Sequence, residues 1–385
     1  MGEFINICAG ADRNSLPESP VKALLFNVLD HCSSQNKINA TKEMYRTCKP
    51  KYSMLDSSGY QLLLAEPTAK ILSFNPELPL EFTGRKINLA PKHVMESAVN
   101  LQPYMPDIVI GLDFPIRKLK DVESAEAEFF KKLEYNVRWA VQSAVWWKEF
   151  CPESKFFIPI QCYDLDQFKV FHDKIGGLDC DGYSMPIRNL EIWEIALFLV
   201  KFYQLGIRRV HLLGTSKLFA IALCAYMARH HFDWVSLDAS SWRKAADKAE
   251  CFNPFDLSRE KFGSRVIIND EFENDCPCPH CTGKTFVEIR SLALKDKLSL
   301  LRNHNWWVLE NIFNDLYENS RDIIQLERFL KSRCKKPAEV DSLCNILSLV
   351  ELMKDTNINL LQDLLGFGSK KRKPSRTSWW QTVPA

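Results

Sequence analysis

The chain has 385 residues, of which 46% are hydrophobic and 25% charged, a composition typical of a globular protein with a full hydrophobic core. The net charge of +2 excludes nucleic-acid binding through overall charge, so any basic surface must come from local clustering. No apolar run reaches the roughly 18 residues of a membrane span, since the stretch Ile195–Phe202 is interrupted by Lys201. The N-terminus lacks a signal-peptide pattern, and the thirteen cysteines are scattered and odd in number. We therefore expect a cytoplasmic protein without membrane contact.

Short β-like runs alternate with longer helical patterns along most of the chain, and this alternation is typical of a parallel α/β protein. The predicted strands are Phe4–Cys8, Tyr52–Asp56, Ile108–Asp113, Phe156–Gln161, Gly182–Met185, Arg209–Leu213 and Trp234–Asp238. The predicted helices include Ser124–Phe150, Leu165–Ile175, Leu190–Leu205 and Leu218–His230.

Polar or acidic residues end four of these strands, namely Asp56, Asp113, Gln161 and Asp238. In a (β/α)8 barrel the carboxyl ends of the strands meet on one face, which carries the active site. Each aspartate taken alone is better explained as a helix cap or a loop residue. Their recurrence at four strand ends favours a barrel enzyme, and we predict an α/β fold with a (β/α)8 TIM barrel over residues 1–270.

A cysteine-rich motif follows the barrel, after a loop-rich stretch with one predicted strand at Ser264–Ile268. Cys276, Cys278 and Cys281 lie within six residues, and His304 follows on a predicted helix. Three thiolates and an imidazole are a ligand set for tetrahedral Zn²⁺. Free cysteines are often buried as small hydrophobic residues, but these three alternate with prolines in a polar loop. Four protein ligands leave no open position for water, so we predict a structural zinc.

The zinc motif defines a predicted subdomain over residues 271–310, followed by C-terminal helices over 311–368 and a basic tail over 369–385. The helical pattern continues to about Leu365. Residues Ser369–Arg376 hold five basic side chains, and Trp379 and Trp380 follow. We expect the tail to be disordered in isolation. It is either a solvated tail or localisation signal, or a nucleic-acid contact through phosphate pairing and base stacking.

The stretch Asp56-Ser57-Ser58-Gly59-Tyr60-Gln61 resembles the Asp-Ser-Gly-Gly-(Phe/Tyr)-Gln signature of tRNA-guanine transglycosylases. These are zinc-containing (β/α)8 enzymes that exchange guanine for a 7-deazaguanine base. The resemblance spans roughly residues 50 to 310, and the motif is specific in combination with the zinc ligands. Further landmarks, each weak alone, follow in family order: Leu89-Ala90-Pro91, Asp107–Asp113, Arg138-Trp139, Ile160-Gln161, Asp181-Gly182-Tyr183, Gly214-Thr215 and Leu237-Asp238.

The resemblance implies roles for individual residues. Asp238 resembles the nucleophile that displaces guanine and forms a glycosyl ester, as in retaining glycosidases. Asp56 resembles the general acid/base that moves protons on the leaving and entering bases. The residues implied in base binding are Tyr60, which stacks on the purine, Asp113 and Gln161, which hydrogen-bond its polar edge, and Ser57. A carboxylate at position 113 can accept both the N1–H and the amino group of guanine.

Two aspartates compete for the nucleophile position, since the stretch Phe232–Asp238 contains both Asp233 and Asp238. The stretch Leu237–Trp242 is similar to the archaeal form of the family, in which Phe-Asp is followed by small residues and an aromatic. This similarity favours Asp238.

Two departures from the family pattern bear on the substrate. Pro186-Ile187 stands where the family has Gly-Gly backbone contacts to the base, and the Arg-rich segment of the bacterial tRNA enzymes is absent. No C-terminal RNA-binding domain of the archaeal kind is evident either. A divergent branch that inserts 7-deazaguanine derivatives into DNA is similar in lacking these features.

We therefore expect base exchange on DNA, with 7-cyano-7-deazaguanine as the incoming base and DNA-modification accessory proteins as partners. One alternative is the same chemistry on tRNA. Another is a non-catalytic nucleic-acid-binding subunit, which the presence of Asp56, Asp113 and Asp238 argues against.

Overall fold

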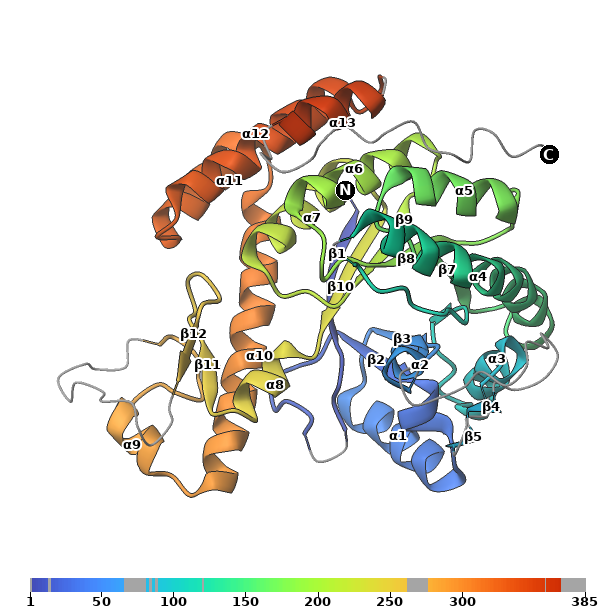
Figure 1. Ribbon diagram of the computed structural model, residues 1–385. Coiled ribbons are helices and arrows are strands. Elements are labelled where there is room, and N and C mark those ends of the chain that lie inside the picture. Colours follow the sequence, from blue (N-terminus) through green and yellow to red (C-terminus); the bar gives the residue numbers. More distant parts are fainter. Residues whose placement is uncertain are drawn as a thin grey trace.

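The computed structural model describes residues 2–12, 15–65, 81–82, 85–86, 89–119, 121–261, 276–356 and 358–367. Eight parallel strands form a closed barrel in the order β1-β10-β9-β8-β7-β6-β3-β2, which confirms the predicted (β/α)8 fold (Figure 1). The barrel strands are β1 (Glu3–Cys8), β2 (Ala23–Asn27), β3 (Tyr52–Asp56), β6 (Ile108–Ile110), β7 (Lys155–Pro159), β8 (Gly182–Pro186), β9 (Arg209–Leu213) and β10 (Trp234–Ala239).

The sequence prediction located seven of these strands and missed β2. This strand is a short apolar run without alternation, and a π-helical turn, η1 (Val28–Cys32), follows it directly, so no polar and apolar pattern of period two marks it. The prediction also extended two strands too far, because β6 ends at Ile110 and β7 at Pro159. Asp113 and Gln161 therefore follow their strands in loops instead of ending them.

Helices surround the barrel, and α4 to α7 correspond to the four helices that the sequence predicted. Helix α5 illustrates both kinds of boundary. It begins after Asp164, whose side chain accepts the Gln167 amide, and it ends before Gly176, which has a left-handed φ of 53°. The helices up to β10 are α1 (Gln35–Cys48), α2 (Gly59–Ala65), α3 (Pro91–Asn100), α4 (Val122–Phe150), α5 (Leu165–Ile175), α6 (Ile192–Gln204) and α7 (Leu218–His230). Short antiparallel pairs are formed by β4 (Glu81–Phe82) with β5 (Arg85–Lys86) and by β11 (Glu250–Phe252) with β12 (Arg259–Lys261).

The part that follows β10 is mostly helical. The predicted helical region through about Leu365 is confirmed. Its elements are α8 (Ser241–Ala246), α9 (Phe286–Ser291), α10 (Leu294–Asn319), α11 (Ile323–Arg333), α12 (Pro337–Met353) and α13 (Ile358–Phe367). The predicted strand Ser264–Ile268, the basic residues Ser369–Arg376, and Trp379 and Trp380 lie outside the described residues.

The long helix α10 covers the outer face of β1, where no helix intervenes between β1 and β2 in the described chain (Figure 1). Phe313 stacks on Phe4 with ring centroids 4.9 Å apart. Glu310 accepts a hydrogen bond from Asn6 Nδ2 (3.0 Å) and pairs with Lys22 (3.3 Å). Helices α12 and α13 pack on α6, so the C-terminal helices form a layer outside the barrel.

Two layers of side chains fill the structure. The small cluster inside the barrel includes Ile7, Met54 and Ile110, and the larger one lies between the strands and the surrounding helices. Among the described residues, no helix is both long enough and apolar enough to cross a membrane.

Asn305 joins α10 to the segment that follows β10. Its side chain is fully buried; Oδ1 accepts the Phe252 amide (2.7 Å), and Nδ2 donates to the carbonyls of Trp242 (3.0 Å) and Glu250 (3.1 Å). Trp242 is itself fully buried and donates Nε1–H to the carbonyl of Ala9 (3.2 Å). The position of α8, directly after β10, therefore depends on this asparagine.

We predict that Asn305→Ala lowers the free energy of unfolding by about 3 kcal/mol, because three buried backbone groups lose their partner at about 1 kcal/mol each. Urea denaturation measures the change. The control is Asn311→Ala on the same helix, whose half-buried side chain donates only to the carbonyl of Trp307. Equal unfolding midpoints for the two variants would contradict a structural role for Asn305.

Candidate active site and metal cluster

Three carboxylates meet at the mouth of the barrel. Asp56 is the last residue of β3, Asp238 lies near the end of β10, and Asp113 follows β6. The parallel strands all point their carboxyl ends toward this mouth, as expected for the fold. Asp233 precedes β10, and its carbonyl accepts the amide of Glu3. Asp238 lies five positions farther along the extended chain, about 16 Å away, so the structure places only Asp238 at the mouth.

Burial sets the acidity of these carboxyl groups. It raises the pKa of Asp56 to about 7, and the nearby charges of Asp113 and Asp238 add to the increase. Burial likewise raises the pKa of Asp113 to about 6 and the pKa of Asp238 to about 6. Carboxyl groups whose pKa values lie near neutral pH can act in one site as a proton donor and as an ionised nucleophile.

The carboxylate of Asp238 is held through one of its two oxygens. The amide N–H of Gly214, in the loop after β9, donates to Oδ1 (2.9 Å). Gly214 has a φ of 85°, a left-handed conformation that favours glycine. On β9, His211 lies completely buried inside the barrel with Nε2 3.7 Å from the same oxygen.

A hydrogen-bonded network connects the predicted base-binding residues. Ser57 Oγ donates to Asp113 Oδ1 (2.7 Å), and Gln161 Nε2 donates to Asp113 Oδ2 (2.5 Å). If the side-chain amide of Gln161 were rotated by 180°, its oxygen would face the carboxylate oxygen and repel it. Asp113 therefore fixes the orientation in which Nε2 faces the carboxylate. Gln161 Oε1 is then a buried acceptor without a hydrogen-bond partner among the described residues. Such a group is suited to accept an N–H from a bound base.

The signature stretch has a backbone that only certain residues allow. A Cβ on Gly59 would lie 2.1 Å from Asp113 Oδ1, so glycine is required there. Ser58, where the signature has its first glycine, adopts a left-handed φ of 74°. Its buried Oγ accepts the Leu29 amide (2.9 Å) and donates to Asn27 Oδ1 (3.1 Å), which offsets the strain. Tyr60, in the first turn of α2, is 48% exposed and accessible to a base.

The structure thus brings together five of the predicted residues, Asp56, Asp113, Asp238, Ser57 and Gln161, while Tyr60 lies exposed on the adjoining helix. The sequence analysis missed His211, Ser58 and the amide of Gly214 as parts of the site. Strand alternation offered a signal for His211, because residues 234, 236 and 238 share one face of β10 and 209, 211 and 213 share one face of β9.

The four predicted metal ligands form a cluster. The Sγ atoms of Cys276, Cys278 and Cys281 lie 3.5, 3.3 and 3.2 Å from His304 Nδ1, and all four ligand atoms lie within 4.8 Å of one another. Sulfur and nitrogen ligands of a tetrahedral zinc are separated by roughly 3.5 Å, given bond lengths of about 2.3 and 2.0 Å. The donor set and spacing are therefore compatible with zinc.

The surroundings of His304 prepare it for this role. Its Nε2 contacts the carbonyl of Phe252 (2.8 Å), an acceptor that places the proton on Nε2 and leaves Nδ1 free to bind a metal. The histidine inside the motif, His280, instead contacts Ser19 (3.1 Å), so it is not part of the cluster.

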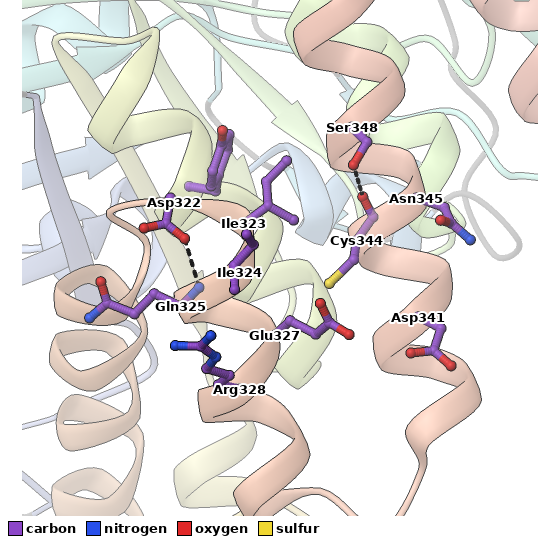
Figure 2. A pocket seen from close by; sticks show the side chains of 11 residues that line it. Asp322, Ile323, Ile324, Gln325, Glu327, Arg328, Asp341, Cys344, Asn345 and Ser348 are labelled. Carbon is purple, nitrogen blue, oxygen red and sulfur yellow. Dashed lines mark hydrogen bonds between the residues drawn. The ribbon is translucent and has the colours of Figure 1, made fainter.

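The large groove drawn in Figure 2 lies elsewhere. It has a volume of about 1010 Å³ and is lined mainly by α11 and α12, with Asp322, Glu327 and Asp341 among its polar side chains. None of the predicted catalytic, base-binding or metal-binding residues lines this groove.

A family model described as TGT, queuine tRNA-ribosyltransferase, matches residues 21–336, which is most of the chain. The matched region includes the barrel strands from β2 to β10 and all four residues of the metal cluster. Members of this family are pentosyltransferases, that is, guanine transglycosylases that act on nucleic acid. No curated protein matches the chain. The family match and the agreement of its region with the barrel show that the chain belongs to the TGT family.

Proposed function

We propose that the protein exchanges guanine in DNA for a 7-deazaguanine base, with 7-cyano-7-deazaguanine as the incoming base, through a covalent ester on Asp238. The observation that carries this proposal is the convergence of Asp56, Asp113 and Asp238 at one barrel mouth, with distinct hydrogen-bond partners for each carboxylate. Each arrangement suits a different task in a base exchange.

In the first half-reaction, a free oxygen of Asp238 attacks C1′ of the target nucleotide, and the glycosidic bond to guanine breaks. Burial raises the pKa of Asp56 to about 7, so this carboxyl group stays protonated up to about that pH and supplies a proton to the departing base. In the second half-reaction, ionised Asp56 removes the N9 proton of the incoming base, which attacks C1′ and releases Asp238. The balance consumes neither water nor ATP.

Base recognition in this scheme belongs to Asp113 and Gln161, with Ser57 as their support. Each oxygen of Asp113 accepts one side-chain hydrogen bond, from Ser57 or from Gln161, and a carboxylate has further lone pairs for a donor on the base. Gln161 Oε1 supplies the unpaired acceptor. Guanine and its 7-deaza analogues present N1–H and an amino group on one edge, and Tyr60 is placed to stack on the ring. The target nucleotide must be flipped out of a duplex or already single-stranded to reach the mouth.

The segment after Asp238 supports DNA over tRNA as the substrate. Arg243 is the single arginine among the ten residues that follow Asp238, and it is engaged with Asp12 (3.1 Å), Asp247 (3.7 Å) and the carbonyl of Gly10. The segment therefore does not offer the Arg-rich surface of the bacterial tRNA enzymes. The alternative is tRNA, which the description of the matching family names.

The covalent intermediate provides the test of function. We predict that wild-type protein, incubated with labelled single-stranded DNA in the absence of an incoming base, forms an adduct that survives a denaturing gel. Asp238→Asn should fold and bind but form no adduct, since a neutral amide is a far poorer nucleophile than a carboxylate. The matched control, Asp233→Asn, changes the exposed aspartate at the opposite end of β10 and should retain the adduct. An adduct on tRNA alone would assign the substrate to RNA, and an adduct that persists in Asp238→Asn would contradict the proposed nucleophile.

The pH dependence of the reaction follows from the pKa values of Asp238 and Asp56. We predict a bell-shaped pH dependence for adduct formation: the rate rises as Asp238 ionises, with a pKa of about 6, and falls as Asp56 loses its proton, with a pKa of about 7. Asp56→Asn should be slower by about 10²–10⁴-fold and should lack the alkaline limb. Single-turnover rates between pH 5 and 9, with Asp233→Asn as control, measure both limbs. An unchanged alkaline limb in Asp56→Asn would remove this aspartate from the acid role.

We also propose that the cluster binds a structural zinc, since it supplies four protein ligands and lies outside the barrel mouth. Cys278→Ser should lose most of the bound zinc, and its thermal midpoint should fall by about 5 °C or more. The control is Cys251→Ser, a neighbouring buried cysteine that is not among the four cluster residues, which should retain one zinc per chain. Elemental analysis and thermal unfolding measure the two quantities. A metal-free Cys278→Ser protein with wild-type stability and activity would refute the role.

A further inference from the structure

The buried imidazole of His211 has no role in the scheme described so far. It lies on β9 beside Ser236 of β10, one inward-facing position below Asp238. Its side chain is fully buried, and its Nε2 atom has no hydrogen-bond partner among the described residues. The carboxylate oxygen Oδ1 of Asp238 lies 3.7 Å from this nitrogen. A buried polar atom aimed at a reactive carboxylate requires an explanation.

The opposite side of the ring is anchored. Ser236 Oγ lies 3.0 Å from His211 Nδ1, and the indole N–H of Trp234 donates to the same hydroxyl (2.9 Å). An indole nitrogen can only donate, so the Ser236 hydroxyl accepts from Trp234 and is free to donate its own proton to Nδ1. Burial lowers the pKa of His211 to about 3, so the ring is neutral. The Ser236 backbone also contacts the ring, and this contact acts against the effect of burial on the His211 pKa. When the Ser236 hydroxyl donates to Nδ1, the neutral ring carries its proton on Nε2, facing Asp238.

Two donors therefore approach one oxygen of the carboxylate. Oδ1 receives the Gly214 amide and faces His211 Nε2–H, so both of these groups from β9 and its loop lie at Oδ1 and not at Oδ2. The backbone amide of Asp238 itself also donates to this carboxylate. Hydrogen bonds in catalytic sites are often long in the unliganded protein and shorten in the complex. A carboxylate held through Oδ1 presents Oδ2 as the attacking atom.

We propose that His211 is a positioning residue for Asp238, which donates Nε2–H to Oδ1 and thereby directs Oδ2 toward C1′ of the nucleotide. This inference rests on the proposed function of Asp238. When Oδ2 bonds to C1′, the negative charge leaves the carboxylate and Oδ1 becomes the ester carbonyl oxygen. When the incoming base attacks, the C1′–Oδ2 bond breaks and its electron pair returns to the carboxylate. The His211 N–H then stabilises the charge that reappears, without itself losing or gaining a proton.

Other charges act on Asp238 and belong in any pH measurement. Asp56 of β3 shares the mouth, and Lys244 of α8 acts to lower the pKa of Asp238. Neither residue contacts His211 through any hydrogen bond in the described structure, so both remain constant when His211 is replaced.

Two substitutions of similar polarity separate the donor role from packing. In His211→Gln the amide nitrogen can reach the position of Nε2, whereas in His211→Asn the shorter side chain can keep only the contact to Ser236. We expect His211→Gln to form the DNA adduct within about threefold of the wild-type rate, and His211→Asn to be about 10- to 100-fold slower, as for the loss of one hydrogen bond to a charged group. Thermal unfolding verifies that both variants are folded. Equal rates in the two variants, whether fast or slow, would overturn the positioning role.

A second measurement does not depend on activity. In wild-type protein, ¹⁵N NMR of His211 should show the neutral Nε2–H tautomer, and ¹³C NMR of Asp238 should show a higher carboxyl pKa in His211→Asn than in wild type or His211→Gln. An Nδ1–H tautomer, or an Asp238 pKa that is the same in both variants, would overturn the inference. Absence of adduct from wild-type protein on every nucleic acid would instead contradict the proposed function, and the NMR result would still decide whether His211 holds Asp238.

Discussion

Closure of the barrel between β1 and β10 is the constraint on which the site depends. These two strands pair over six residues, from Glu3 with Trp234 to Cys8 with Ala239, and β1 also pairs with β2. A closed ring of parallel strands has a single mouth, so residues from distant parts of the chain must share it. Asp56 and Asp238 are 182 positions apart in the sequence, yet the charge of one raises the pKa of the other. The fold holds together carboxylates that would separate in an unfolded chain, a strain typical of functional sites.

The part of the chain after the barrel supports this closure from outside. On α10, His304 belongs to the metal cluster and the next residue, Asn305, binds the carbonyl of Trp242. Trp242 lies four residues after Asp238 and reaches back to the carbonyl of Ala9, directly after β1. A metal in the cluster would therefore stabilise the residues that follow β1 and β10, where these two strands close the barrel. The metal cluster itself lies outside the mouth. The helix that carries His304 also covers β1 through Phe313, so one element performs both tasks.

Much of this arrangement could be predicted from the sequence, because residue type and spacing alone identify it. The cysteine motif requires only short-range spacing and a distant histidine, and the aspartates mark the ends of strands with clear apolar runs. The strand β2 escaped prediction because its five residues do not alternate and a π-helical turn follows at once. Ser58 and His211 escaped for a different reason. The left-handed backbone of Ser58 is stabilised by Leu29 and Asn27 from another strand end, and the role of His211 depends on which face of β9 lies inward. Both are tertiary properties.

The residues that replace the Gly-Gly pair of the family pattern show where selectivity must come from in the proposed reaction. Pro186 has no amide hydrogen, and the amide of Ile187 already donates to the carbonyl of Leu213 on the neighbouring strand (3.1 Å). Neither backbone group is free to donate to a base. Recognition is then left to the side chains of Asp113 and Gln161, which face the edge that guanine and its 7-deaza analogues have in common. A pocket of this kind accepts the departing and the incoming base by the same contacts, as an exchange reaction requires. The 7-substituent must then be distinguished by groups other than the backbone of Pro186 and Ile187.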